Sequence, residues 1–90
     1  MLNAVLFAFH KDSEQIQIVS ADKRDQRFLN DIGKDRAVGN GRTADVVVLD
    51  ILRKIENTQH EVVSVSYSVE DGRIHRWYVY YRSQHRDPML

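Results

Sequence analysis

The residues that could carry covalent catalysis gather around one dipeptide, Asp71-Gly72. If this dipeptide is a tight turn between two strands, Ser68 and His75 lie opposite one another. The carboxylates of Glu70 and Asp71 are near that pair, and a serine, a histidine and a carboxylate can form an activated nucleophile. The tip of a hairpin, however, offers neither donors for an oxyanion nor walls around a substrate. We therefore predict that the protein is not an enzyme and has no catalytic residue.

The sequence gives metal and cofactor chemistry no better support. It contains no cysteine, which excludes thiolate catalysis, disulfides and iron–sulfur clusters. Its histidines are His10, His60, His75 and His85. No two of them have helical metal-ligand spacing, and no acid stands beside them at a zinc-motif position. We therefore expect no metal site and no cofactor.

The strongest candidate for binding chemistry is the stretch from 73 to 86, which mixes arginines, histidines and aromatic residues and contains no acid. Aromatic rings that stack on bases, framed by arginines, suit single-stranded nucleic acid. The same residue types suit a protein interface equally well. In a third interpretation Tyr78 and Tyr80 are core residues, and the arginines only solubilise an edge strand. The candidate surface, for protein or nucleic acid, comprises Arg73, His75, Arg76, Trp77, Tyr81 and Arg82.

A second polar motif, Gly39-Asn40-Gly41-Arg42, stands just before a predicted helix. Backbone amides at a helix start can hold a phosphate, and Arg42 would add charge. The spacing matches neither the dinucleotide fingerprint nor the phosphate-binding loop. We therefore expect residues 34–42 to be a mobile loop that ends where Thr43 caps the helix.

Length and composition limit the remaining possibilities. The chain has 90 residues, which is one domain, and its 42% hydrophobic content is too high for a disordered protein. Thirteen basic residues balance thirteen acidic ones, and a net charge near zero favours self-association. The apolar segment 2–9 is too short to span a membrane and lacks the basic flank of a signal peptide. We expect a cytoplasmic protein that does not enter a membrane.

The segment 61–82 is typical of a β-hairpin, because β-branched and aromatic residues flank Asp71-Gly72. A type I′ turn needs positive φ at both central residues, and it pairs Glu70 with Arg73. One face then pairs Val69 with Ile74, Tyr67 with Arg76, Val65 with Tyr78, and Val63 with Tyr80. The other face pairs Ser68 with His75, Ser66 with Trp77, Ser64 with Val79, and Val62 with Tyr81.

This pairing predicts different environments for two large aromatic residues. Trp77 would lie over Ser66 on the face away from the main core, exposed or covered by another chain. Tyr80 would lie on the opposite face, in the core. The serine face, with Trp77 and Tyr81, would then be the binding surface.

Residues 2–10 and 16–20 are predicted to form another hairpin. A two-residue turn at Asp12-Ser13 would connect them. The pairs that follow are Phe9 with Ile16, and Phe7 with Ile18. Both faces of the first strand are apolar, which indicates a central strand covered on both sides, or one whose second face meets another chain.

Two helices are predicted between the hairpins. The first covers 22–32, with Asp22 as its cap, Asp25 in its first turn and Gly33 at its end. The second runs from Ala44 to about Asn57, and its apolar face comprises Ala44, Val47, Val48, Ile51, Leu52 and Ile55. Three consecutive valines leave a strand over 45–49 as the alternative. The unbroken helical period after them favours the helix.

The predicted order is β-β-α-α-β-β, an α+β two-layer sandwich of one four-stranded antiparallel sheet with two helices. We expect one domain over 1–90, with 83–90 as a frayed tail. The function that these features favour is a small non-enzymatic binding protein that acts through protein contacts and self-associates into a homo-oligomer. The alternative is a nucleic-acid-binding module that uses the basic, aromatic C-terminal strand.

Overall fold

The computed structural model describes residues 2–20 and 22–83. It contains four strands and two helices in the predicted order. They are β1 (Leu2–His10), β2 (Gln17–Ser20), α1 (Lys23–Ile32), α2 (Ala44–Glu56), β3 (His60–Glu70) and β4 (Ile74–Ser83). Ser83, predicted to begin a frayed tail, belongs to β4, and the rest of that tail lies outside the described residues.

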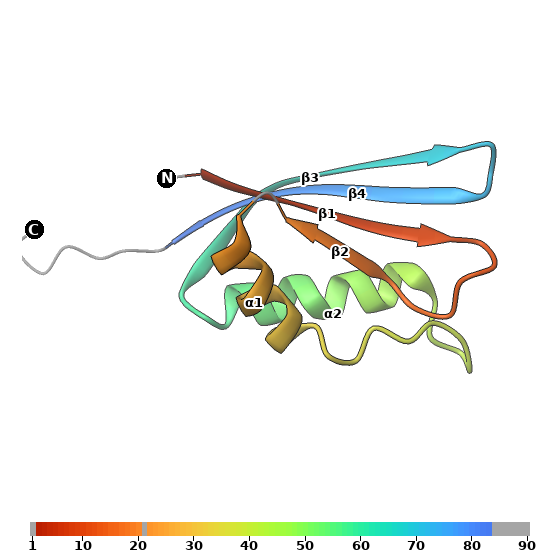
Figure 1. Cartoon of the computed structure of the whole chain (residues 1–90), viewed down its shortest axis with the longest axis horizontal. Coiled ribbons are helices and arrows are strands. Elements are labelled where there is room, and N and C mark those ends of the chain that lie inside the picture. The colour runs from red at the N-terminus through yellow and green to blue at the C-terminus, as the bar shows by residue number, and fades with distance from the viewer. Residues whose placement is uncertain (1, 21, 84–90) are drawn as a thin grey trace, which may run out of the picture.

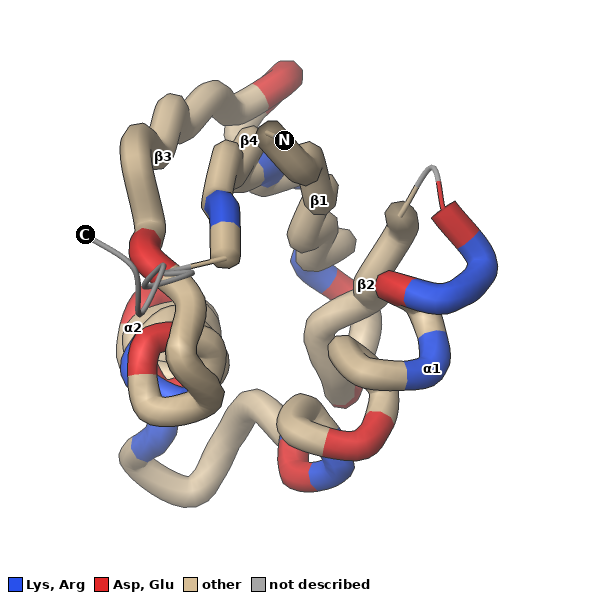
Figure 2. The backbone as a smooth tube through the Cα atoms, turned by 90° about the vertical axis from the view of Figure 1, so that its left-hand side faces the viewer, with Lys and Arg blue, Asp and Glu red and all other residues tan. Residues whose placement is uncertain are grey.

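The strands form one antiparallel sheet in the order β2-β1-β4-β3. Both helices lie on one side of this sheet, α2 beneath β3 and α1 beneath β2 (Figures 1 and 2). The predicted α+β two-layer architecture is therefore confirmed. β1 is central in the sheet, since it lies between β2 and β4, but the described helices cover only one of its faces (Figure 2), so the predicted cover on both sides is wrong.

The sequence signals at the helix ends act as expected. The Asp22 side chain accepts a hydrogen bond from the Arg24 amide at 2.8 Å and caps α1, and Gly33 ends that helix. This bond to the ionised carboxylate also lowers the pKa of Asp22. Thr43 accepts from the Val46 amide and caps α2. The segment 45–49 is helical, so the strand alternative is wrong.

The core lies between the sheet and the two helices. Four residues of α2 are buried there, namely Val47, Val48, Ile51 and Ile55. The sheet contributes Val5 and Phe7 from β1 and three residues of β4, namely Trp77, Val79 and Tyr81. Val46 and Leu49, which fall off the predicted apolar face of α2, are 44% and 45% exposed. The helical period of α2 therefore identified its buried and exposed sides correctly.

The first hairpin has the predicted pairing but a longer connection. Phe7 lies opposite Ile18, as expected. The turn, however, is formed one residue earlier, because the Ser13 amide donates to the His10 carbonyl at 2.8 Å. Ile16 precedes β2 and donates its amide to the Arg36 carbonyl, so the expected pair of Phe9 with Ile16 is not part of the ladder.

The second hairpin has the predicted turn and a different register. Asp71 and Gly72 have φ of 53° and 64°, and the Arg73 amide donates to the Glu70 carbonyl at 2.9 Å. These are the features of a type I′ turn. Glu70, however, pairs with Ile74 and not with Arg73. The predicted register is therefore wrong by one residue over most of the hairpin.

The neighbouring strand explains this shift. β1 pairs with β4 along its whole length, and the Lys11 amide extends that contact by donating to the Arg73 carbonyl at 2.8 Å. Arg73 is thus an extra residue between the turn and the β3–β4 ladder. An irregularity between Val62 and Ser64 restores the predicted pair of Val62 with Tyr81. Bulges of this kind insert one residue and change which side chains share a face.

The shifted register reverses the predicted environments of the two aromatic residues. Ser66 lies opposite Tyr78 and Ser64 opposite Tyr80, while Trp77 lies opposite Tyr67. Trp77 is 6% exposed and belongs to the core, whereas Tyr80 is 41% exposed. The serines do lie on the face away from the helices, as predicted, but with Tyr78 and Tyr80 beside them.

The turn provides a direct stability test. Replacing Gly72 by valine should lower the free energy of unfolding by more than about 1 kcal/mol, because a β-branched residue is strained at positive φ. No atom lies within 4 Å of a Cβ built at this position, so the loss would come from the backbone alone. The measurement is urea denaturation. Gly72→Asn is the control and should lose less, since asparagine tolerates this conformation. Equal stability of the valine variant and wild type would contradict the turn.

Candidate functional site: the uncovered face of the sheet

The face of the sheet opposite the helices is covered by no other described element, and its centre is apolar. β1 contributes Leu2, Ala4 and Leu6, and β4 contributes Tyr78 and Tyr80. Val19 of β2 lies opposite Leu6 on the same face. The large residues here are strongly exposed: Leu2 by 56%, Val19 by 50%, Tyr78 by 43% and Tyr80 by 41%. We call this surface the open face.

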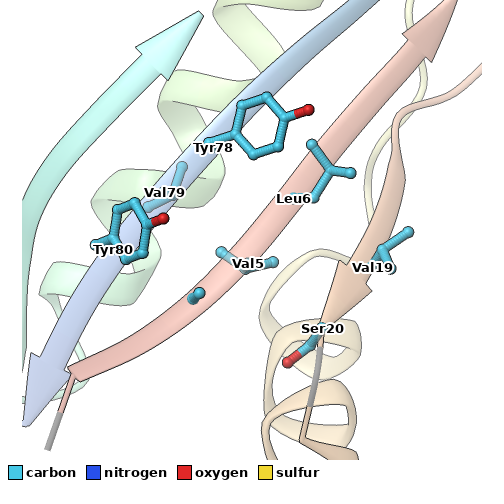
Figure 3. Close-up of a pocket in the computed structure, with 8 residues that line it drawn as sticks. Val5, Leu6, Val19, Ser20, Tyr78, Val79 and Tyr80 are labelled. Atoms are coloured by element: carbon cyan, nitrogen blue, oxygen red, sulfur yellow. The ribbon is translucent and has the colours of Figure 1, made fainter.

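The centre of the open face is hollowed. A shallow depression of about 260 Å³ is lined by residues of β1, β2 and β4. Figure 3 shows Leu6, Tyr78 and Tyr80 projecting from this face, with the helices behind the sheet. Its lining is almost entirely hydrocarbon and aromatic ring, with the Tyr78 and Tyr80 hydroxyls as polar tips. Such a surface can bind another molecule by excluding water from apolar groups.

Polar and charged groups flank this apolar centre. Ser64, Ser66 and Ser68 of β3 lie opposite Tyr80, Tyr78 and Arg76 of β4. Arg76 forms an ion pair with Glu70 at 2.9 Å, and Arg82 forms one with Glu61 at 2.9 Å. An apolar centre bounded by polar groups and paired charges resembles the core and rim of a protein interface.

The structure separates the six residues that the sequence analysis grouped as a binding surface. Arg76 and Arg82 lie on the open face, and Arg73 lies in the exposed turn. His75, Trp77 and Tyr81 project to the helix side. Trp77 and Tyr81 are buried, so the prediction that they form an exposed aromatic surface is wrong.

The aromatic residues of the open face, Tyr78 and Tyr80, were treated as core residues in the predicted register. A signal for their placement exists in the strand itself. Side chains alternate between faces along a strand, and the set of Trp77, Val79 and Tyr81 includes no arginine, whereas Tyr78 and Tyr80 share their face with Arg76 and Arg82. Assigning that set to the core would have placed both tyrosines outside.

The combination of Ser68 and His75 does not form a site. Ser68 lies opposite Arg76 on the open face, whereas His75 lies opposite Val69 on the helix side. The Nδ1 atom of His75 is hydrogen-bonded to the Tyr67 hydroxyl at 2.6 Å. Its ring also stacks on those of Tyr67 and Trp77, with centroids 5.9 and 6.2 Å away. His75 is therefore part of an aromatic cluster on the face opposite to that of Ser68.

The glycine-containing loop before α2 is organised by its arginine. Arg42 forms ion pairs with Asp35 at 3.0 Å and with Asp50 at 2.9 Å. The hydrogen bond to Asp50 raises the pKa of Arg42. Arg42 thus joins the two ends of the loop to α2, and both of its partners are carboxylates. Residues 34–42 therefore form a loop, as predicted, but these ion pairs and the backbone hydrogen bonds between Gly39 and Arg42 organise it, whereas a mobile loop was expected.

Other kinds of site find no support in the described part of the chain. Within residues 2–20 and 22–83, no group of three or more histidine and acidic side chains is arranged to hold a metal ion. None of the helices described is long and apolar enough to cross a membrane. No protein-family model, no curated protein and no solved structure matches the chain.

Proposed function

We propose that this protein is a small non-enzymatic binding protein that acts through contacts with other proteins, including its own copies. The observation that supports this proposal is the open face, where Leu2, Val19, Tyr78 and Tyr80 are each more than two-fifths exposed. Exposing this much clustered apolar surface to water is unfavourable, and a partner that covers it gains the corresponding free energy.

The chemistry of the open face favours a protein partner over a small charged ligand. Aliphatic side chains from β1 and β2 surround the two tyrosines, and the nearest arginines are already paired with glutamates. Tyrosine is enriched at protein interfaces because its ring is apolar and its hydroxyl can meet water or a polar partner.

Replacing Tyr78 and Tyr80 together by serine should weaken partner binding about tenfold or more, the effect of removing an interface anchor. The fold should be retained, because both side chains are largely exposed. Proteins captured from a lysate by the wild type are identified, and their affinities for both forms are then measured by calorimetry.

The matched control replaces Val46 and Leu49, which are similarly exposed on α2, by serine. This control should bind the captured partner like the wild type. Equal losses in the two double variants would contradict a role for the open face. A wild type that captures no partner and stays monomeric at tens of micromolar would overturn the proposed function.

One observation favours the alternative, a nucleic-acid-binding module. Arg76, Tyr78, Tyr80 and Arg82 alternate along the open face of β4. Two exposed aromatic rings between arginines can stack bases and contact phosphates. Their glutamate partners reduce the charge available for phosphates. Under our leading proposal, single-stranded DNA and RNA should not bind at about 100 μM at low salt. Salt-sensitive binding of nucleic acid that is lost when both tyrosines are replaced by serine would instead establish the alternative.

A further inference from the structure

Among the described residues, the outer edge of β3 is the longest unpaired edge of the sheet. β3 has eleven residues, whereas β2 at the other edge has four. From Val63 to Glu70 every residue of β3 is exposed. Val65, Tyr67 and Val69 are on the helix side of the sheet, yet they are 43%, 52% and 48% exposed. The amides and carbonyls on the outer side of such a strand can accept another strand.

Beyond the irregularity at one end, this edge lacks the charges and prolines that usually prevent strand pairing. Residues 62–69 are valine, serine and tyrosine only, without charge, proline or glycine. Lysine, proline and inward-pointing charges are the common protections of an edge strand. Figure 2 shows β3 as an uncharged tube between two acidic segments. The irregularity between Val62 and Ser64 interrupts one end and leaves 64–70 as the regular part.

The charges at the two ends of this edge are neutralised within the chain. Glu61 is paired with Arg82, and Glu70 is paired with Arg76. A charged peptide would find no opposite charge along the uncharged run. A second copy of β3 suits this edge, because its central run is also uncharged and the glutamates at its two ends are also paired with arginines of their own chain. An antiparallel copy also places the Glu70–Arg76 pair of one chain toward the Glu61–Arg82 pair of the other.

We propose that two copies of this protein pair antiparallel through β3 and form one continuous sheet of eight strands. The inference rests on the self-association included in the proposed function, and it adds the surface and the geometry. A two-fold axis perpendicular to the sheet relates the copies, so the same residues meet on both sides. The helices of both copies then lie on one side of the joined sheet, and both open faces lie on the other.

Side-chain alternation restricts the register of this pair. Residues opposed across two antiparallel strands point to the same face. A serine of one copy, which lies on the open face, must therefore lie opposite a residue on the open face of the other copy. A slip by one residue would place the valines of one copy opposite the serines of the other. Using the whole regular segment 64–70 places Tyr67 on the two-fold axis. The other pairs are Ser64 with Glu70, Val65 with Val69, and Ser66 with Ser68 of the second copy.

The experiment measures the oligomeric state of the full chain by analytical ultracentrifugation over a range of concentrations. The wild type should be a dimer at tens of micromolar. Tyr67→Lys puts two lysines opposite each other on the axis and should raise the dissociation constant about tenfold or more. Val46→Lys is the matched control, since Val46 is 44% exposed but lies on α2, outside both β3 and the open face. It should leave the dimer intact, and circular dichroism verifies that both variants are folded.

The absence of cysteine permits a second measurement that does not depend on weakening the dimer. Tyr67→Cys places one thiol of each copy at the axis, where directly opposed residues are close enough for a disulfide or a short thiol cross-link. We expect a covalent dimer under mild oxidation or with a short bismaleimide. Val19→Cys, on β2 at the other edge, should not form one with the same efficiency.

Three results would overturn pairing through β3, and they separate it from the proposed function. A dimer broken by a third variant, Tyr80→Lys, but not by Tyr67→Lys would mean self-association through the open face. A monomeric wild type that binds a different protein would also leave the proposed function standing. A wild type that neither dimerises nor binds a partner would remove both. A Tyr67→Cys variant that cross-links no better than Val19→Cys would count against β3 even if the protein is a dimer.

Discussion

Replacing Trp77 by alanine is expected to lower the free energy of unfolding by about 3–5 kcal/mol, the cost of truncating a large aromatic residue in a core. Trp77 is 6% exposed, lies opposite Phe7 of β1 and packs within the cluster between the sheet and the helices. Its ring also contacts that of Tyr67, with centroids 5.3 Å apart. Alanine would leave a cavity that these neighbours cannot fill without moving. Urea denaturation followed by circular dichroism measures the loss.

Tyr80→Ala is the matched comparison on the same strand. Its side chain is 41% exposed on the open face, so the loss should be well below that of Trp77→Ala. The difference follows directly from the observed register of β4 against β1 and β3. Equal losses from the two changes, or a larger loss at Tyr80, would show that β4 presents its other face to the core.

Tyr81→Ala should cause a comparable loss of about 3–5 kcal/mol, since Tyr81 is fully buried. Tyr81→Phe is expected to behave differently. Among the described residues the buried Tyr81 hydroxyl has no hydrogen-bond partner. Burial raises the pKa of Tyr81, and the carboxylates of Asp25 and Asp22 add to this effect, so the hydroxyl stays neutral and donor-capable at ordinary pH. An unsatisfied buried polar group destabilises the folded state.

Removing only that hydroxyl should therefore leave the free energy of unfolding unchanged or raise it by up to about 1 kcal/mol. The pair of variants separates the packing of the ring from the polarity of its tip. Denaturation of wild type, Tyr81→Phe and Tyr81→Ala under the same conditions gives both differences. A loss of more than about 1 kcal/mol in Tyr81→Phe would indicate that the hydroxyl makes a stabilising hydrogen bond, with Asp25, whose carboxylate helps to raise the pKa of Tyr81, as the candidate acceptor.

Features that depend on nearby residues could be predicted from the sequence. Asp22 and Thr43 cap the helices because a side-chain oxygen meets a free amide two or three residues ahead. Asp71-Gly72 forms the turn because both residues adopt positive φ. The period of α2 separates its buried residues from Val46 and Leu49. Together these local signals were sufficient for the β-β-α-α-β-β order.

The register of β3 and β4 could not be predicted from the hairpin alone. The tight turn by itself pairs Glu70 with Arg73, and nothing between these residues indicates otherwise. The register of β4 is set by its other neighbour, β1. Phe7 of β1 lies opposite Trp77, and the amide of Lys11, just after β1, donates to the Arg73 carbonyl. β1 lies far away in the sequence, and the competition between two ladders for one strand is settled by core packing.

The candidate site was misplaced for the same reason. The arginines of the open face were identified, but a shift of one residue exchanges the aromatic residues of the two faces. The sequence analysis therefore placed Trp77 and Tyr81 on the exposed face, where the structure has Tyr78 and Tyr80. Attention to the charges on each face of β4 would have favoured the observed arrangement, because Arg76 and Arg82 share the face of Tyr78 and Tyr80, and charged residues are rarely buried.

The central position of β1 and β4 constrains how the chain can fold. These strands pair along their full length, although β1 is the first described strand and β4 the last. Closing so long a loop costs chain entropy before the contacts compensate it, which slows folding relative to a protein with local pairings. During synthesis, β1, β2 and α1 emerge without the strand that completes their core. We therefore expect the nascent chain to acquire its native sheet only after β4 has left the ribosome, and a chain truncated before Ile74 to remain unfolded.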